Sequence, residues 1–317
     1  MSNTDNKAIS VIICTFNRAG SLGGTLDSFL GLEGDAPWAP ELVVVDNNST
    51  DQTPAVVERY RARLGDRLKY VFEPRQGLSA ARNKGVRAAS GEILAFVDDD
   101  VVLDTKWLKA VRGLFSDSAV DAGGGRVLPV YPHGAPLWIL DSKDILGGPM
   151  PYHDYGEGAR PYDRSMYPFV GANIFFRRAL LARVGEFRED LGVGAGCLGE
   201  DSEMFLRARE AGGRLVYCGQ ALVWHKIDAS RMNLRYLRHW FVQAGRTQAR
   251  MSDDERSCVC YGGVPRYLFR MLPQAAVAMA FGLGRSRSFL CAYRDFFLTA
   301  GAVQEYRWKA RARGSAS

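Results

Sequence analysis

The sequence lacks the features that would mark a membrane-spanning, secreted or zinc-binding protein. Its longest apolar stretch, Val264 to Leu283, is interrupted by two arginines and a proline, so the uninterrupted part is short for a bilayer. The first seven residues are polar and carry no signal-peptide core. Of six scattered cysteines only Cys258 and Cys260 lie close together, and no second pair completes a zinc site. We expect free thiols in a reducing cytosol.

Internal repeats and low-complexity tracts are also missing, and the composition is that of an ordinary globular protein. The 317 residues are 47% hydrophobic and 24% charged, which suits one large domain with a smaller piece, or two domains. The net charge of +6 is concentrated at the C-terminus, where seven basic and two acidic residues follow from Arg285 onward. This basic tail indicates an anionic partner such as a lipid surface, although a solvated helix face has the same pattern. We expect no nucleic-acid partner.

The first half of the chain alternates strand and helix patterns. The strands are near-continuous apolar runs, as expected when both faces of a strand are buried. The β-α-β-α order predicts an α/β fold with a doubly wound, mostly parallel sheet. The predicted strands are Ile9–Cys14, Glu41–Val45, Leu68–Phe72 and Ile93–Val97, and the predicted helices are Ser21–Leu30, Thr53–Leu64, Leu78–Ala89 and Thr105–Phe115.

Regular patterns fade in the second half. Residues Val130 to Pro168 show no period, and a segment of this length is usually a lid or binding loop. A strand at Phe169–Phe176, a helix at Asp201–Ala211 and two short strands at Leu215–Tyr217 and Ala221–Trp224 are predicted to follow.

The tail after His225 is predicted to be helical. Leu234, Leu237, Phe241 and Ala244 share one helix face. The later apolar stretch fits either a helix lying in a membrane interface or one packed on the main domain, and the sequence does not separate the two. A homodimer contact is a further role for the tail.

An acidic triplet, Asp98-Asp99-Asp100, closes the apolar run Glu92–Val97. The short run and the preceding glycine are typical of a buried strand. Carboxylates clustered at a strand end repel one another, and a divalent cation with oxygen ligands would offset that repulsion. In open α/β sheets, ligands bind at the carboxyl ends of strands. Taken alone, a solvated loop with Asp104 as a helix cap explains the triplet equally well.

Polar residues also follow the other predicted strands. Asn17 and Arg18 come after the first strand, and Asp46, which could accept hydrogen bonds from a base or ribose, ends the second. Residues 47–51 fit turn and helix-cap chemistry as well. The helix after the third strand carries Arg82 and Asn83 near its start, and an arginine beside a phosphate pocket makes bidentate contacts.

In this order the motifs resemble those of glycosyltransferase family 2, over roughly Ile9 to His225. A single motif is unspecific, whereas the ordered set is specific. Members of that family have the GT-A fold and are inverting, nucleotide-sugar-dependent enzymes. The matching segments are Thr15–Arg18, Asp46–Asp51, Gly77–Gly85, Phe96–Asp100, Gly171–Arg178, Gly199–Glu203 and Val223–His225.

The resemblance implies a metal site and a donor site. Asp100 would be a metal ligand, Asp98 would lie nearer the ribose or donor sugar, and His225 matches the family's late metal-binding histidine, although a lone histidine is more often structural. Mixed oxygen and nitrogen ligands with diphosphate suit Mn²⁺ or Mg²⁺. The nucleotide-sugar-binding residues that the resemblance suggests are Thr15, Asn17, Arg18, Asp46, Arg82, Asn83, Asp98, Asp99, Gly171 and Asn173.

The resemblance also places the catalytic base at Asp201, with Glu200 positioning the acceptor or donor. Inverting transfer needs one carboxylate to deprotonate the attacking hydroxyl. Acidic residues are also favoured in a first helical turn by the helix dipole, which explains why they are tolerated there.

We therefore predict an inverting, metal-dependent glycosyltransferase that moves a sugar from a nucleoside diphosphate, with UDP expected, to a glycan or lipid-linked acceptor hydroxyl. Residues 1–228 would be the GT-A catalytic domain and 229–317 a basic helical extension. The setting would be bacterial surface polysaccharide or glycolipid synthesis, with the enzyme peripheral on the cytoplasmic membrane face. A nucleotidyltransferase is one alternative, but Thr15-Phe16-Asn17 stands where its Gly-rich loop would be. The other is a non-catalytic nucleotide-sugar-binding partner, against which the intact acidic residues argue.

Overall fold

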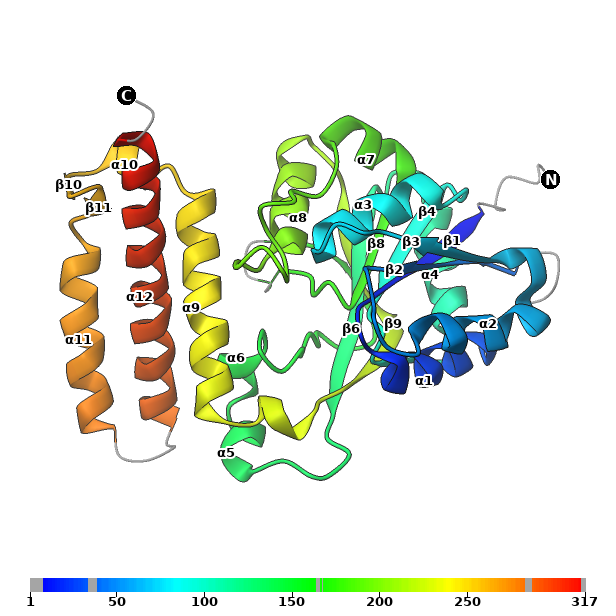
Figure 1. Ribbon diagram of the computed structural model, residues 1–317, viewed down its shortest axis with the longest axis horizontal. Coiled ribbons are helices and arrows are strands. Elements are labelled where there is room, and N and C mark those ends of the chain that lie inside the picture. The colour runs from blue at the N-terminus through cyan, green and yellow to red at the C-terminus, as the bar shows by residue number, and fades with distance from the viewer. Residues whose placement is uncertain (1–7, 34–38, 164–165, 167, 283–286, 315–317) are drawn as a thin grey trace. The chain divides into compact units, whose positions relative to one another are not determined.

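The computed structural model describes residues 8–33, 39–163, 166, 168–282 and 287–314, which form two compact units (Figure 1). The first, called here the α/β unit, contains the chain up to Val130 together with Pro151–Gly194 and Glu200–Lys226. The second, called the helical unit, contains Tyr131–Met150, Ala195–Gly199 and the chain from Ile227 onward. The functional division at residue 228 stays a prediction.

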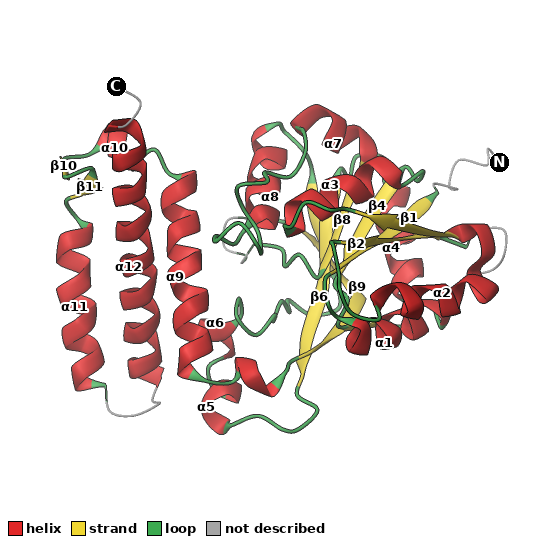
Figure 2. Cartoon of the chain, viewed as in Figure 1, coloured by secondary structure: helices red, strands yellow, loops and turns green. Residues whose placement is uncertain are grey.

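The first four strands of the α/β unit pair in parallel, as the sequence predicted (Figure 2). β1 lies between β2 and β4, and β3 pairs with β2. All four carboxyl ends therefore meet at one edge of the sheet, which is the edge that carries the polar motifs. Their bounds are Ile9–Thr15 for β1, Glu41–Asp46 for β2, Leu68–Phe72 for β3 and Ile93–Val97 for β4.

The rest of the sheet is mixed. β8 (Asn173–Arg177) runs antiparallel to β4 and to β6 (Ala122–Val130), and β6 runs parallel to β9 (Leu215–Lys226). The short strands β5 (Val101–Leu103) and β7 (Ala159–Pro161) both run antiparallel to β9. The full order is β3-β2-β1-β4-β8-β6-β9-β5.

Three predictions about this half were wrong. Strand β6 was not predicted because its sequence begins with a run of glycines, which usually weakens a strand. The glycines are required by packing, since a Cβ at Gly124 would collide with Phe169 and a Cβ at Gly125 with Asn173. The two short strands predicted after residue 214 are one strand, β9, with a register shift beside Gly125. The strand predicted at Phe169–Phe176 begins only at Asn173.

Helices cover both faces of the sheet, which confirms the doubly wound α/β fold. Alternate residues of a strand enter different cores: Val11 and Ile13 pack with one, and Ile12 with the other. The first core includes residues of α1 (Ala19–Leu30), α2 (Thr53–Leu64) and α4 (Trp107–Ser116). The second includes residues of α3 (Leu78–Ala88), α7 (Arg178–Val184) and α8 (Glu200–Glu210).

The helical unit is built around three long helices, α9 (Leu234–Met251), α11 (Leu268–Phe281) and α12 (Arg287–Gly314). Gly245 of α9 and Gly301 of α12 allow close approach, because a Cβ at either would collide with the other helix's backbone. On the predicted face of α9, Leu237 and Phe241 are buried, while Leu234 and Ala244 are partly buried. The short elements are α5 (Leu137–Leu140), α6 (Lys143–Leu146), α10 (Asp254–Ser257), β10 (Cys260–Tyr261) and β11 (Val264–Pro265).

The described residues between 130 and 168 are more ordered than the sequence suggested. They contain α5, α6 and β7, and α5 and α6 pack their apolar side chains on the core of the helical unit. Leu283 and Arg285, which were part of the predicted apolar and basic tail, lie outside the described residues. Within the described ranges, none of the helices is both long and apolar enough to cross a membrane.

No disulfide links any of the six cysteines, all of which lie among the described residues. Burial raises the pKa of the Cys14 thiol to about 12, so this residue behaves as a small apolar side chain in the second core.

Candidate active site

Two strands that are distant in the sequence bring a histidine beside the acidic triplet. His225 lies in β9 opposite Val101 of β5, directly after the triplet. The backbone N–H of Lys226 donates to the carbonyl of Asp100 over 3.0 Å. The sheet register therefore fixes the position of the imidazole relative to the carboxylates.

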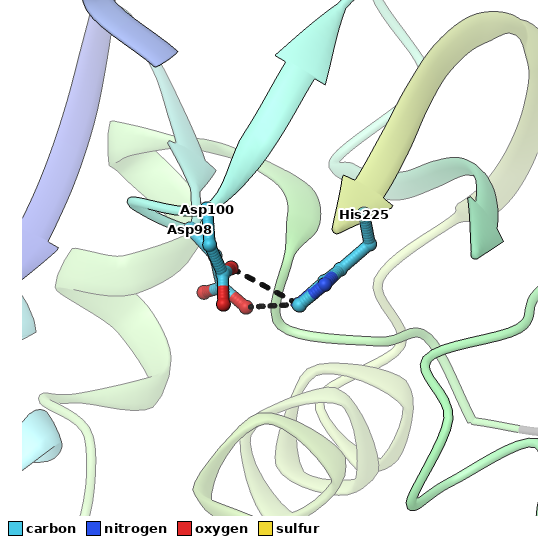
Figure 3. A group of neighbouring side chains, drawn as sticks. All are labelled: Asp98, Asp100 and His225. Atoms are coloured by element: carbon cyan, nitrogen blue, oxygen red, sulfur yellow. Dashed lines mark ion pairs between the residues drawn. The ribbon is translucent and has the colours of Figure 1, made fainter. Parts of the chain in front are cut away.

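The side chains of Asp98, Asp100 and His225 converge (Figure 3). His225 Nε2 lies 3.5 Å from an oxygen of Asp98 and 3.2 Å from Asp100 Oδ1. The other ring nitrogen, Nδ1, lies 3.2 Å from the carbonyl of Lys226, so Nδ1–H can donate there and leave the Nε2 lone pair facing the carboxylates. One ligand atom from each residue lies within 4.8 Å of the others.

This set of donors fits a divalent cation. Two carboxylates and an imidazole whose Nδ1 lies beside a backbone carbonyl match the oxygen and nitrogen ligands used for Mn²⁺ and Mg²⁺. Asp100 and His225 are buried, whereas Asp98 is partly exposed. The sequence assigned Asp98 to the ribose or donor sugar, and the structure places its carboxylate among the candidate metal ligands as well.

Arg18 forms ion pairs with the triplet. Its Nη1 lies 2.5 Å from Asp100 Oδ2 and 3.8 Å from Asp99 Oδ1, and the side chain is about two-fifths exposed. Burial raises the pKa of Asp99 to about 7, and the Arg18 guanidinium opposes this shift. An arginine that is both partly exposed and next to the carboxylates can also reach an anionic ligand at the sheet edge.

Asn17 and Asp46 hold the loops that border the edge. Asn17 has a φ of 52°, and its side-chain oxygen accepts from the N–H of Thr50 over 2.7 Å. Asp46 is fully buried and accepts from Ser49 N over 2.8 Å and from the Tyr70 hydroxyl over 2.6 Å. Both residues are where the sequence predicted them, and both have partners within the protein.

Asn47 has a positioning role that the sequence did not reveal. Its side chain accepts from Gly77 N over 2.9 Å and donates to the carbonyls of Glu73 and Arg75. Its own N–H donates to the carbonyl of Thr15, the buried last residue of β1, over 2.8 Å. Asn47 thus joins three loops at the sheet edge. In the sequence, only its position directly after β2 could have indicated this role, and a polar residue at that position is equally typical of a turn.

A second carboxylate cluster lies at the start of α8. Asp201 Oδ2 accepts from Gly171 N over 2.7 Å, and Oδ1 accepts from Ser202 N over 2.6 Å. Glu200 forms a buried ion pair with Arg82, whose Nη2 also lies 3.4 Å from the carbonyl of Gly171. Burial raises the pKa of Glu200, and Arg82 opposes this shift.

The pairing of Arg82 with Glu200 differs from the phosphate contact that the sequence suggested. The guanidinium is buried between α3 and α8 and links Glu200 to the strand that follows Gly171. A side chain at Gly171 would collide with Arg82 and approach Asp201 Oδ2 to 3.0 Å. Arg82 and Gly171 therefore position the Glu200–Asp201 pair.

Two further predicted binding residues are used inside the fold. Asn173 is fully buried, accepts from Trp107 Nε1 over 2.9 Å, and donates to the carbonyls of Arg126 and Ala221. Asn83 is also buried and exchanges hydrogen bonds with the backbone of Phe187. The structure brings neither amide to the carboxylate clusters.

Comparison with known proteins identifies related chains. The profile of "Glycosyl transferase family 2" matches residues 10–185. The chain is 26% identical over 248 residues to the succinoglycan biosynthesis protein ExoM of Rhizobium meliloti, covering 78% of this chain and 76% of ExoM. It is 42% identical over 105 residues to validoxylamine A glucosyltransferase of Streptomyces hygroscopicus subsp. limoneus, covering 32% of this chain and 22% of that enzyme.

Solved structures share the fold. The mannosyltransferase PcManGT from Pyrobaculum calidifontis, in complex with GDP-Man and Mn²⁺, has a TM-score of 0.55 at 22% identity, covering 99% of this chain and 76% of that one. S. aureus TarS 1–349 in complex with UDP has a TM-score of 0.55 at 20% identity, covering 98% and 92%. These similarities confirm the predicted GT-A fold.

Proposed function

The chain belongs to glycosyl transferase family 2 and is a glycosyltransferase, and we propose that it transfers a sugar with inversion from a nucleoside diphosphate sugar to an acceptor hydroxyl. The observation that carries this proposal is the convergence of Asp98, Asp100 and His225 at the sheet edge that also holds Arg18 and Asp46. Family membership disfavours the two alternatives, a nucleotidyltransferase and a non-catalytic binding partner.

We assign Asp98, Asp100 and His225 to a divalent cation, Mn²⁺ or Mg²⁺. When bound, the cation neutralises charge on the departing diphosphate. The Nδ1 contact of His225 with its own strand supports this assignment, because it orients Nε2 as a ligand. The Mn²⁺ in the PcManGT complex is consistent with it.

The donor site lies along the carboxyl ends of β1, β2 and β4 in this proposal. Arg18 contacts the diphosphate, while Thr15, Asn17 and Asp46 shape the loops around the nucleoside. Asp99 lies beside Arg18 and limits how far its guanidinium can move. Complexes of the related folds with GDP-Man and UDP support a nucleotide-sugar donor, and we propose UDP as the nucleotide.

Asp201 acts as the base. It accepts the proton of the acceptor hydroxyl as that oxygen attacks the anomeric carbon and the bond to the diphosphate breaks. Hydrogen bonds from Gly171 N and Ser202 N hold both carboxylate oxygens in place. Oδ1 also accepts from Ser202 Oγ, whereas Oδ2 accepts only from Gly171 N among the hydrogen bonds of the described residues and keeps a lone pair for the incoming proton. Glu200, paired with Arg82, fixes the first turn of the helix that carries Asp201.

The acceptor is proposed to be a glycan or a lipid-linked sugar of a bacterial surface polysaccharide or glycolipid. The name of the relative ExoM places that protein in succinoglycan biosynthesis. We place the enzyme in the cytoplasm, at the inner face of the membrane.

The test is a thermal-shift screen of nucleotide sugars with and without Mn²⁺, since a ligand that binds only the folded state raises its stability. We expect one UDP-sugar to raise the melting temperature more with Mn²⁺ than without. That donor is then used in a transfer assay, in which proton NMR reports the anomeric configuration of the product. Retention of configuration, or no donor that binds, would contradict the proposal.

A further inference from the structure

Helix α11 exposes apolar side chains along its whole length. Phe269, Pro273, Val277 and Phe281 recur every four residues and form one exposed stripe. Val277 is 55% exposed and Phe281 is 83% exposed. From Met271 to Phe281 the helix carries no charged residue, and its single polar side chain is Gln274. Solvent-facing stripes of ordinary surface helices are polar or charged.

The opposite side of α11 is already covered by its own unit. Leu268 is buried and Leu272 partly buried against Val303 and Tyr306 of α12, and Ala275 is buried as well. The helix is therefore apolar both where it packs and where it is exposed, and Figure 1 shows α11 running alongside α12 within the helical unit. A helix that is apolar all round is a core helix or one that meets lipid.

A second element of the helical unit, α5, also exposes apolar side chains. Met279 of α11 and Trp138 of α5 pack on the same core cluster. On α5, Leu137 is 75% exposed and Leu140 is also exposed. Arg287 at the start of α12 pairs with Asp144 of α6 in the same unit. Leu137 and Leu140 therefore add to the exposed apolar surface of the helical unit.

The net charge of the helical unit indicates which kind of partner would bind the exposed stripe. The helical unit carries 16 Lys and Arg residues against 8 Asp and Glu, a formal net charge of +8, whereas the α/β unit is at −2. Arg266 and Arg270 are exposed at the N-terminal end of the apolar stripe. A nucleic acid would match the charge but would leave the apolar stripe in water. An anionic bilayer supplies a negative surface and an apolar phase together.

We propose that α11 binds the helical unit to an anionic membrane surface by inserting its exposed stripe among the lipid acyl chains. The helix has 14 residues, a length of about 21 Å, which is short of the ~30 Å hydrocarbon core. It therefore lies in the interface and does not cross it. This inference extends the proposed function. It rests on that function in one respect only, namely that a membrane surface would present the lipid-linked acceptor.

The test is flotation of the full-length protein with vesicles of phosphatidylglycerol and phosphatidylcholine in equal parts, and with phosphatidylcholine alone. We expect binding to the anionic vesicles that weakens between about 0.05 and 0.5 M NaCl, because salt screens the surface charge, with a fraction that resists salt. The double variant Val277→Glu with Phe281→Glu should lower binding by about tenfold or more, since it removes apolar area from the inserted stripe. Val277→Leu with Phe281→Leu should retain binding.

Val259→Glu is the matched control. Val259 is 61% exposed in the same unit but lies outside α11 and α5, so the same substitution there should leave flotation unchanged. Equal loss in Val259→Glu would overturn the assignment to α11. Failure of the wild type to float with any vesicle, combined with a dimer by light scattering that the double variant abolishes, would show that a second copy covers the stripe.

The outcome is independent of the donor chemistry. All substituted side chains are exposed, so circular dichroism and the nucleotide-sugar thermal shift should match the wild type. A double variant that binds donor but not vesicles supports the membrane inference, whereas a wild type that floats but binds no donor would contradict only the proposed reaction.

Discussion

His225 Nε2 lies 3.2 Å from Asp100 Oδ1, although His225 belongs to β9 and Asp100 to the turn between β4 and β5, far away in the sequence. The carbonyl of Lys226 lies 3.2 Å from the other ring nitrogen, so in the Nδ1–H tautomer the Nε2 lone pair faces the carboxylates. In the proposed metal site the two side chains are ligands of different kinds that the fold already holds together.

Substitution of Asp100 should abolish metal-dependent donor binding. Asp100→Ala removes a buried charged ligand, and we expect loss of transfer together with loss of the Mn²⁺-dependent part of UDP-sugar affinity in calorimetry. His225→Ala removes a neutral ligand and should weaken metal affinity less, by about 10- to 100-fold. Normal Mn²⁺ dependence in Asp100→Ala would show that the metal is held elsewhere.

Asp201→Asn should separate chemistry from binding. The amide keeps the shape of the carboxylate and can still accept from Gly171 N, but it cannot take up the acceptor proton. We expect nearly unchanged donor affinity and a fall in kcat of about 100-fold or more. Glu210→Gln, at the exposed end of the same helix, is the control. If donor affinity falls as much as kcat, Asp201 is a binding residue.

Asn173→Ala should damage the fold and leave donor affinity intact in the molecules that remain folded. The substitution leaves the indole N–H of Trp107 and two backbone carbonyls without their partner, which costs about 2 to 4 kcal/mol of unfolding free energy. Urea denaturation measures this loss. Gln220→Ala, which removes an exposed amide from β9, should change stability by less than about 0.5 kcal/mol. If the Asn173→Ala protein were stable but bound the donor more weakly, Asn173 would be a donor-binding residue, as the sequence suggested.

His153 should make the protein less stable in acid. Its ring is buried among Tyr155, Phe169 and Tyr217, and neither ring nitrogen has a hydrogen-bond partner. Burial lowers the pKa of His153 to about 4, from an ordinary value of 6.5. Between these two pH values the unfolded chain takes up a proton that the folded chain does not, so stability falls as the pH drops through this window.

The substitution His153→Phe isolates this effect, because other titrating groups contribute equally to both proteins. The stability of the variant relative to the wild type should rise by up to about 3 kcal/mol between pH 7 and pH 4. Thermal or urea unfolding at several pH values measures it, with His133→Phe at an exposed position as the control. A difference that does not change with pH would mean that His153 has the same pKa in the folded and the unfolded protein.

The parallel half of the fold could be predicted because its signals are local. β1 to β4 are continuous apolar runs, and Asp46 and the acidic triplet mark where β2 and β4 end. The carboxylates of the proposed metal site come directly after the end of β4. The resemblance supplied His225, since nothing near this residue in the sequence connects it with the triplet.

The other half depends on contacts between distant residues. The glycines of β6 look like a loop until Phe169 and Asn173 are seen to occupy the space of their missing side chains. Arg82 looks like a phosphate ligand until its pairing with Glu200 is known. A local sequence pattern shows which chemical group is present. It does not show which other residue of the folded protein that group contacts.

The division of the chain into units constrains the order in which it can be assembled. The polypeptide passes between the α/β unit and the helical unit five times, because residues 131–150 and 195–199 belong to the latter. During synthesis, Ile139, Ile145 and Leu146 emerge well before Leu237, Phe241 and Leu290, against which they pack. These apolar side chains can become buried only after the C-terminal part of the chain has been synthesised. In a chain cut after residue 227 these apolar side chains would stay exposed, and the shortened enzyme would tend to aggregate. Such a truncation could therefore not test the role of a single helix.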